Sequence, residues 1–381
     1  MSRHAAATLI LMCFLSVHAS AQDHPTTLPI GAAAPDFNLP GIDGKNHRLA
    51  DYASAKVLVI VFTCNHCPTA QLYETRIKAL AADYRDKGVA LVAIEPNNPK
   101  AVLLSELGYT DLSDSFEEMK IRAEYRHFNF PYLYDGETQS VARAYGPVAT
   151  PHVFVFDAER RLRYEGRVDD SPRENLVKRR DAREAIDAVL AGKAVAVAST
   201  PAVGCSTKWM FKEAGREREQ KEYEAEPVSV TLASAEDLKA LRAKPDGKVR
   251  LIDFWATWCG PCIEEMPDLI TMYRMYRHRP FELIMVSTNY PDEKSGVLRA
   301  LNEHHASNTN LLFGTTDNYG LMAAFDSSWK GAVPYTVLLD TNGEVVYKVQ
   351  APIDPIELRR KIIATIPDDD YIGHRAYWSS R

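Results

Sequence analysis

The chain has no excess of positive charge and no long apolar segment. Its formal net charge is -6 at pH 7, from 45 Lys and Arg against 51 Asp and Glu. Proteins that bind nucleic acid or anionic membranes usually present a basic face, so we expect neither partner. The apolar run near the start, residues 5–17, is too short for a transmembrane helix, which needs about 20 residues.

Cysteine is scarce, with 6 in 381 residues. Four of them form two Cys-x-x-Cys pairs, Cys64 with Cys67 and Cys259 with Cys262. Structural disulfides that staple distant segments would space the cysteines differently. Each pair follows an apolar strand pattern and leads into a helical pattern. Unpaired N–H groups at a helix start stabilise a thiolate and lower its pKa. The spacing therefore predicts two redox-active sites.

The first 21 residues are typical of a cleaved secretory signal. Arg3 and His4 precede the apolar run, and Ala19-Ser20-Ala21 supplies small residues before Gln22. Removal of this signal would leave five cysteines in an oxidising compartment, the periplasm or another extracytoplasmic space. We expect no stable membrane insertion after cleavage.

The length predicts two domains, because a single core rarely grows to 381 residues. We assign the first to residues 28–197 and the second to residues 228–367. Between them, residues 198–227 are dense in charges of both signs and are expected to form a solvated helix or linker. Residues 368–381 form a C-terminal tail.

Both domains follow the same order of elements, with a strand before the cysteine pair, a helix, a parallel strand, and later a hairpin and a final helix. In the first domain we expect strands or helices at 57–62, 68–87, 89–94, 114–127, 153–156, 162–166 and 173–190, the fourth of these in an insertion, 96–129. In the second we expect them at 236–242, 249–255, 262–277, 281–287, 294–305, 311–313, 319–325, 336–340, 344–349 and 355–366. The helix at 114–127 would be capped by Ser113 or Asp114.

Two stretches resemble one family. Trp258-Cys259-Gly260-Pro261-Cys262, followed by Glu265-Met266-Pro267, resembles the thioredoxin superfamily, and within it the extracytoplasmic TlpA/ResA-like thiol-disulfide oxidoreductases. Thr63–Pro68, with Ala34–Leu39 upstream, resembles the peroxiredoxin-like thioredoxin-fold proteins. The resemblance implies an α/β protein of two tandem thioredoxin-like folds, each a central mixed sheet flanked by helices.

The resemblance also implies an activity. It is thiol-disulfide exchange in redox homeostasis, with protein disulfides or dithiols as substrates, an extracytoplasmic electron donor, and no cofactor or metal. Cys259 and Cys64 would attack, and Cys262 and Cys67 would resolve the mixed disulfide. The partner, the direction of electron flow and the oligomeric state stay open, and Cys205 is expected to be a quiet single thiol.

Supporting residues follow from the same resemblance. Asp253 aligns with the buried acid that takes a proton from the resolving cysteine, and burial would raise its pKa toward neutrality. In the first domain, the matching position before the cysteine pair holds Leu58. His66, directly before Cys67, would donate to the Cys64 thiolate or attract it as a cation, which makes the first site the more oxidising.

Each domain also has a proline at the start of its hairpin. Pro151 and Pro334 stand where thioredoxin-like proteins have a cis-proline beside the cysteines. The residue before each, Thr150 or Val333, would then offer its backbone to a substrate strand near the disulfide.

Other functions stay open for the first domain. Cys64, Cys67, His66 and His152 are suitable copper or zinc ligands, so a metallochaperone-like role is one alternative. A thiol-dependent peroxidase is another, although the proline and threonine of the peroxiredoxin signature are absent before Cys64. A partner-binding scaffold without catalysis is the third, and intact cysteine pairs argue against it.

Overall fold

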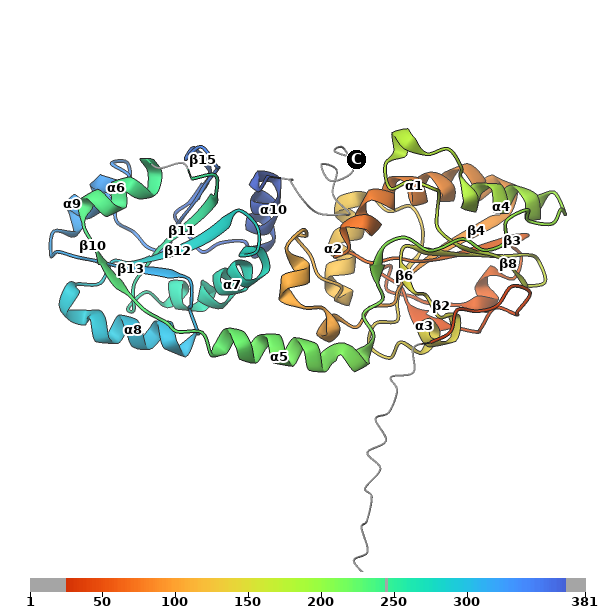
Figure 1. Ribbon diagram of the computed structural model, residues 1–381, viewed down its shortest axis with the longest axis horizontal. Helices are drawn as coiled ribbons and strands as arrows, with labels where there is room; N and C mark the ends of the chain where they lie inside the picture. Colours follow the sequence, from red (N-terminus) through yellow and green to blue (C-terminus); the bar gives the residue numbers. More distant parts are fainter. Residues whose placement is uncertain (1–24, 244–245, 368–381) are drawn as a thin grey trace, which may run out of the picture.

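The computed structural model describes residues 25–243 and 246–367, which form two α/β domains side by side (Figure 1). The expected secretory signal, residues 1–21, and the expected tail, residues 368–381, lie outside this described part. Within it, no helix has both the length and the apolar character needed to cross a membrane.

The first domain is built on a five-stranded mixed sheet in the order β5-β4-β3-β7-β8. Its central strand β3 pairs with β4 in parallel and with β7 antiparallel. The sheet strands are β3 (Val57–Phe62), β4 (Val89–Glu95), β5 (Tyr132–Tyr134), β7 (His152–Phe156) and β8 (Leu162–Gly166), with β1 (Asn38–Pro40) and β2 (Asn46–Arg48) forming a separate hairpin. The helices are α1 (Pro68–Tyr84), α2 (Phe116–Arg126), α3 (Ser140–Tyr145) and α4 (Asp181–Leu190).

Every residue of β3 is buried because side chains on both faces of the sheet are covered. Val57, Val59 and Val61 pack in one apolar cluster with residues of α1 and α4. The alternate residues of the strand pack in a second cluster with α3 and β7. An unbroken apolar run is what a strand buried on both faces requires.

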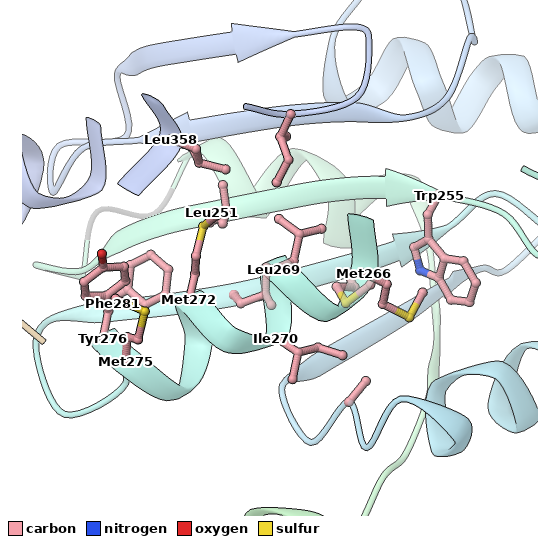
Figure 2. Packing of buried hydrophobic residues seen from close by; sticks show 14 of the residues in the cluster. Leu251, Trp255, Met266, Leu269, Ile270, Met272, Met275, Tyr276, Phe281 and Leu358 are labelled. Atoms are coloured by element: carbon pink, nitrogen blue, oxygen red, sulfur yellow. The ribbon is translucent and has the colours of Figure 1, made fainter. Parts of the chain in front are cut away.

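The second domain has a six-stranded sheet in the order β10-β13-β12-β11-β14-β15. Its strands are β10 (Thr231–Ala233), β11 (Val249–Trp255), β12 (Phe281–Ser287), β13 (Thr309–Phe313), β14 (Tyr335–Leu339) and β15 (Val345–Val349). The helices are α6 (Ala235–Ala243), α7 (Gly260–Tyr276), α8 (Lys294–Glu303), α9 (Asn318–Phe325) and α10 (Pro355–Thr365). Figure 2 shows the core between β11 and α7, where Leu251 and Trp255 face Met266 and Leu269.

Two predicted helices of the first domain start later than expected. The helix expected over 173–190 begins only at Asp181, whose carboxylate is held by Arg167 and Arg179. The helix expected from Asp114 begins at Phe116, with Ser115 as its cap in a capping box with Glu118. Asp114 does not cap this helix, because its carboxylate accepts hydrogen bonds from the backbone N–H groups of Asn65 and His66.

The first half of the expected linker packs on the first domain, and its charged half forms the expected helix. Residues 198–212 fold onto the first domain, where Trp209 joins the core and β9 (Cys205–Ser206) pairs with β6 (Ala149–Thr150). The charged stretch forms α5 (Glu213–Glu224), which runs along both domains (Figure 1). Glu219 and Tyr223 are buried on its inner face, and Glu219 accepts hydrogen bonds from the backbone of Leu104 and Ser105.

The insertion between β4 and β5 lies at the contact between the domains. Leu104 and Leu107 from this insertion join the core cluster of the second domain. Tyr276 of α7 donates a hydrogen bond from Oη to the carbonyl oxygen of Thr110 at 2.9 Å. Arg360 of α10 bonds to Asp111 at 2.9 Å. The insertion therefore links the first cysteine site to the second domain.

Candidate active sites

The second site lies at the first turn of α7. Cys259 is the N-cap residue of this helix, and the N–H of Cys262 donates to its Sγ at 3.3 Å. The two cysteines form a disulfide. Cys259 is 5% exposed, while the neighbouring Trp258 is 68% exposed. The disulfide therefore lies just below an exposed aromatic surface.

Asp253 is fully buried in β11, as expected. Thr336 donates to its Oδ1 at 3.0 Å, and Oδ2 has no hydrogen-bond partner within the described residues. Burial, with the charge of Glu265 adding to it, raises the pKa of Asp253 to about 8. A carboxyl of this kind can exchange a proton near neutral pH.

Glu265 is a second buried acid that sequence reasoning did not single out as functional. It accepts a hydrogen bond from the N–H of Ile353 at 2.9 Å, and burial raises its pKa to about 7. Its position one helical turn after Cys262 was the available signal, because residues three apart share a helix face.

At the first site, the helix begins after the second cysteine of the pair rather than after the first. Helix α1 begins at Pro68, so its N-cap residue is Cys67 rather than Cys64. The Cys67 sulfur accepts from the N–H of Ala70 at 3.4 Å and from the N–H of Cys205 at 3.3 Å. Cys64 lies before the helix, with its Sγ 3.0 Å from the Thr150 hydroxyl. Both thiols of the pair are buried.

These contacts divide the two thiols electrostatically. Burial raises the pKa of Cys64 well above its ordinary value, and the hydrogen bond and charge of Cys67 raise it further. Burial alone would also raise the pKa of Cys67, but hydrogen bonds from Cys205 and Cys64 and the positive charge of His66 bring that pKa well below its ordinary value. These directions differ from the low pKa expected for Cys64 and favour a thiolate at Cys67.

The register of the strands shows which residues of the two domains are equivalent. Phe62 pairs with His152, which follows Pro151, and Phe254 pairs with Tyr335, which follows Pro334. Phe62 and Phe254 are therefore equivalent positions.

Counting forward from these phenylalanines, Cys67 corresponds to Cys259 and Ala70 to Cys262. The hydrogen bonds support this alignment, because the N–H of Ala70 donates to the Cys67 sulfur as the N–H of Cys262 donates to the Cys259 sulfur. The counterpart of Asp253 is Val61, and not Leu58 as the cysteine spacing predicted.

The His66 side chain pairs with Asp114, whereas the sequence predicted that it would stabilise a thiolate at Cys64. Its Nδ1 is bonded to the Asp114 carboxylate, and both side chains are buried. Burial alone would lower the pKa of His66, but the charge and hydrogen bond of Asp114 raise it. The Asp114 carboxylate therefore favours the protonated form of His66, and the charge of that form lowers the pKa of Cys67.

Asp114 was missed as a site residue by sequence reasoning. Its carboxylate accepts from the backbone N–H groups of Asn65 and His66, each at 2.9 Å, and from Asn97 at 2.8 Å. It comes from the insertion, distant in sequence from the cysteine pair. No local pattern marks such a contact, and the acid was instead interpreted as a helix cap.

The expected metal-ligand set does not assemble as predicted. His152 accepts at Nδ1 from the N–H of Val148 and contacts Glu165 through Nε2 at 2.9 Å, so both ring nitrogens are occupied. Potential ligand atoms of Cys64, His66 and Asp114 lie within 4.8 Å of one another. The donor set available to a metal is therefore one sulfur, one imidazole and one carboxylate.

Both hairpin prolines follow cis peptide bonds, Thr150–Pro151 and Val333–Pro334. The residues before them differ in exposure. Val333 is half-buried, whereas Thr150 is fully buried and pairs with Cys205 in the β6–β9 ladder. The residue before the cis-proline is therefore partly exposed in the second domain and covered by β9 in the first.

Known families match each domain. The AhpC/TSA family model matches residues 30–165, and the Redoxin model matches residues 220–361. The thiol:disulfide interchange protein HelX of Rhodobacter capsulatus is 29% identical over 119 residues, which cover 31% of this chain and 60% of that protein. The interchange protein CycY of Rhizobium leguminosarum bv. viciae is 30% identical over 140 residues, covering 37% of this chain and 69% of that protein.

Among solved structures, a hypothetical protein of Sinorhizobium meliloti, SMc02350, is 36% identical, with a TM-score of 0.43. The alignment covers 49% of this chain and 97% of that one. Two family models match this chain, one for each domain, and CycY is similar to it. The structure agrees with them, because each of its two sheets has a cysteine pair at a strand-to-helix junction. The chain belongs to the thioredoxin superfamily, with two thioredoxin-fold domains in tandem.

Proposed function

We propose that this chain is an exported thiol-disulfide oxidoreductase that exchanges dithiol for disulfide with protein partners. The observation that carries the proposal is the Cys259–Cys262 disulfide at the N-terminus of α7, with buried Asp253 in the adjoining strand. The names of HelX and CycY as interchange proteins support it. Export rests on the signal-like residues 1–21.

In the reduced second site, Cys259 would be the attacking thiolate, because it lies at the positive end of α7. Its attack on a protein disulfide forms a mixed disulfide, and one sulfur of the partner leaves as a thiolate. Cys262 then gives its proton to Asp253 and attacks the Cys259 sulfur. The second partner sulfur leaves, so two electrons pass to the partner and the Cys259–Cys262 disulfide forms.

Substrate would bind beside Val333. An extended segment of a partner can pair with the backbone of this half-buried residue, which directly precedes cis-Pro334. The same position of the first domain is covered by the chain itself. We therefore assign direct exchange with large protein partners to the second domain. We propose that this domain reduces disulfides of its partners and receives its electrons from an extracytoplasmic donor.

At the first site we assign attack to Cys67 and resolution to Cys64, which reverses the roles expected from the sequence. A peroxidase function stays an alternative for this domain. Counted back from Cys67, the positions of the peroxiredoxin proline and threonine hold Ile60 and Cys64. The signature is absent in this register as it was in the first.

Metal binding is a second candidate because Cys64, His66 and Asp114 converge. The ion pair between His66 and Asp114 opposes it, since a metal would have to displace that contact. We expect purified reduced protein to retain clearly less than one copper or zinc per chain after dialysis against a weak chelator. Stoichiometric retention that is lost in Cys64→Ser would instead favour a metallochaperone-like role.

The activity is tested with the full chain carrying Cys67→Ser, which leaves the second site intact. After reduction and removal of excess reductant, we expect one equivalent of this variant to reduce one disulfide of a model protein. Cys259→Ser added to the same background should abolish the transfer. Equal reduction by both variants, or by neither, would refute the proposal for the second domain.

A further inference from the structure

The chain covers the cis-proline loop of its own first domain with a cysteine-bearing strand. In the β6–β9 ladder, Thr150 pairs with Cys205 and Ala149 with Ser206. Thr150 directly precedes cis-Pro151, in the position that we assign to substrate pairing at Val333 of the other domain. Strand β9 therefore occupies the place of a substrate strand.

The segment around Cys205 is built for this close contact. A Cβ atom on Gly204 would lie 1.8 Å from the carbonyl oxygen of Thr150, so only glycine fits there. On the other side, Thr207 donates from Oγ1 to the carbonyl of Pro147 at 2.7 Å. The N–H of Lys208 donates to Asn97 at 2.8 Å. These contacts hold Cys205 in one position.

That position brings a third sulfur to the first site. The N–H of Cys205 donates to the Cys67 sulfur, and a side-chain hydrogen bond from Cys205 lowers the pKa of Cys67. Cys205 packs against the buried cluster of Cys64, Cys67 and Ala70. It is itself only partly buried, whereas Cys64 and Cys67 are 3% and 0% exposed. Cys205 is therefore the one cysteine of this group that is partly exposed.

We propose that Cys205 is a third redox-active thiol of the first domain and forms a disulfide with Cys67. This inference rests on the proposed thiol-disulfide exchange function and deepens it. When Cys67 holds a mixed disulfide, the Cys205 thiolate attacks the Cys67 sulfur, the Cys67–Cys205 bond forms, and the partner sulfur leaves as a thiolate that takes up the Cys205 proton. Cys64 can release the partner from Cys67 by the same exchange.

The two resolving thiols also make the disulfide movable within the site. The Cys205 thiolate can attack Cys67 in a Cys64–Cys67 disulfide, which forms Cys67–Cys205 and releases Cys64 as a thiolate. The exchange needs no further oxidant, because one disulfide is broken for each one formed. It moves the disulfide from two buried cysteines to a pair that includes the partly exposed Cys205, which a reducing partner can attack.

The test uses the full chain carrying Cys64→Ser, reduced and then oxidised with diamide, which accepts two electrons and two protons per disulfide formed. Free thiols are alkylated and the disulfides are mapped by mass spectrometry. We expect Cys67 and Cys205 to be recovered mainly as one disulfide-linked peptide pair. Cys64→Ala should give the same result, which covers the case in which serine disturbs folding.

A matched pair of glycine variants tests the geometry without removing a thiol. Gly204→Ala in the Cys64→Ser background should lower the yield of the Cys67–Cys205 disulfide severalfold, because the added methyl group displaces β9. Gly296→Ala meets no atom within 4 Å and should leave the yield unchanged.

The Cys259–Cys262 disulfide is the internal standard for oxidation in each sample. If it forms while Cys67 and Cys205 stay alkylated in both Cys64 variants, the inference is overturned and the proposed function of the second domain is untouched. Equal yields from Gly204→Ala and Gly296→Ala would also overturn it, because random collision would then explain the pairing.

Discussion

Cys67 and Cys259 occupy equivalent positions in the two domains, each capping the helix that follows the central strand. Each accepts the N–H of the residue three positions later, Ala70 or Cys262. The two Cys-x-x-Cys pairs are therefore not equivalent, although their spacing is identical. In the second domain the other cysteine of the pair lies inside the helix, and in the first it precedes the N-cap cysteine.

This relationship predicts which thiol of the first site is reactive. In the Cys259→Ser/Cys262→Ser background, Cys64→Ser should keep a thiol whose alkylation persists at a lower pH than that of an ordinary cysteine, and Cys67→Ser should lose this thiol. The reason is that N–H groups and the charge of His66 stabilise only the Cys67 thiolate. The rate of iodoacetamide labelling against pH, with peptide mapping, measures this. Rapid labelling of Cys64 in Cys67→Ser would contradict it.

His66 should set the potential of the first site. Replacing His66 with Leu removes an imidazole whose positive charge lowers the pKa of Cys67, so a Cys67 thiolate in the reduced form is stabilised less. We expect the reduction potential to fall by at least about 30 mV, which is about 1.4 kcal/mol for this two-electron couple. Equilibration of the full chain with glutathione buffers, followed by quantification of Cys67 alkylation, measures the shift.

Asp114→Asn is the companion variant for His66. It removes the carboxylate that keeps the imidazole protonated, so it should lower the potential in the same direction while His66 remains. An unchanged potential in both variants would mean that the ion pair only holds the loop together.

Asp253 should make stability depend on pH in a defined window. Its pKa is about 8 in the folded chain, and its ordinary value is 3.8. Between these values the folded state binds more protons than the unfolded state, so the stability of the native sequence falls as pH rises from about 4 to about 8. Asp253→Asn has no carboxyl to titrate at this position. Its free energy of unfolding relative to that of the native sequence should therefore increase by at least about 2 kcal/mol from about pH 4 to about pH 8.

Urea unfolding of the oxidised protein at several pH values measures that difference. Glu264→Gln, an exposed change on the same helix as Cys262, should show a flat difference from the native sequence. A flat difference for Asp253→Asn as well would show that the carboxyl is solvated and not a proton acceptor.

The sequence predicted most of the second domain because its patterns are local. The strands at 249–255 and 281–287 have the predicted bounds, and α7 begins within two residues of the prediction. Both cis peptide bonds occur where the family resemblance expected them. Buried Asp253 was found because its spacing to Cys259 follows the family pattern.

The first site was harder to predict because its geometry depends on distant segments. Spacing alone aligned Cys64 with Cys259, and only the strand pairing of Phe62 with His152 reveals the three-residue shift. Asp114 and Cys205 reach the site through the insertion and through β9. Neither contact leaves a local pattern, so one residue was interpreted as a helix cap and the other as a quiet thiol.

The central claim is that Cys259 exchanges disulfides with protein partners, and trapping in cells tests it most directly. Cys262→Ser keeps the attacking thiol and removes the group that releases the partner, so it should accumulate mixed disulfides through Cys259. Cys259→Ser, at the same expression level, should accumulate none at the second site. If Cys262→Ser gives no reductant-sensitive adducts, or both variants give the same ones, the account of this protein as a thiol-disulfide oxidoreductase is contradicted.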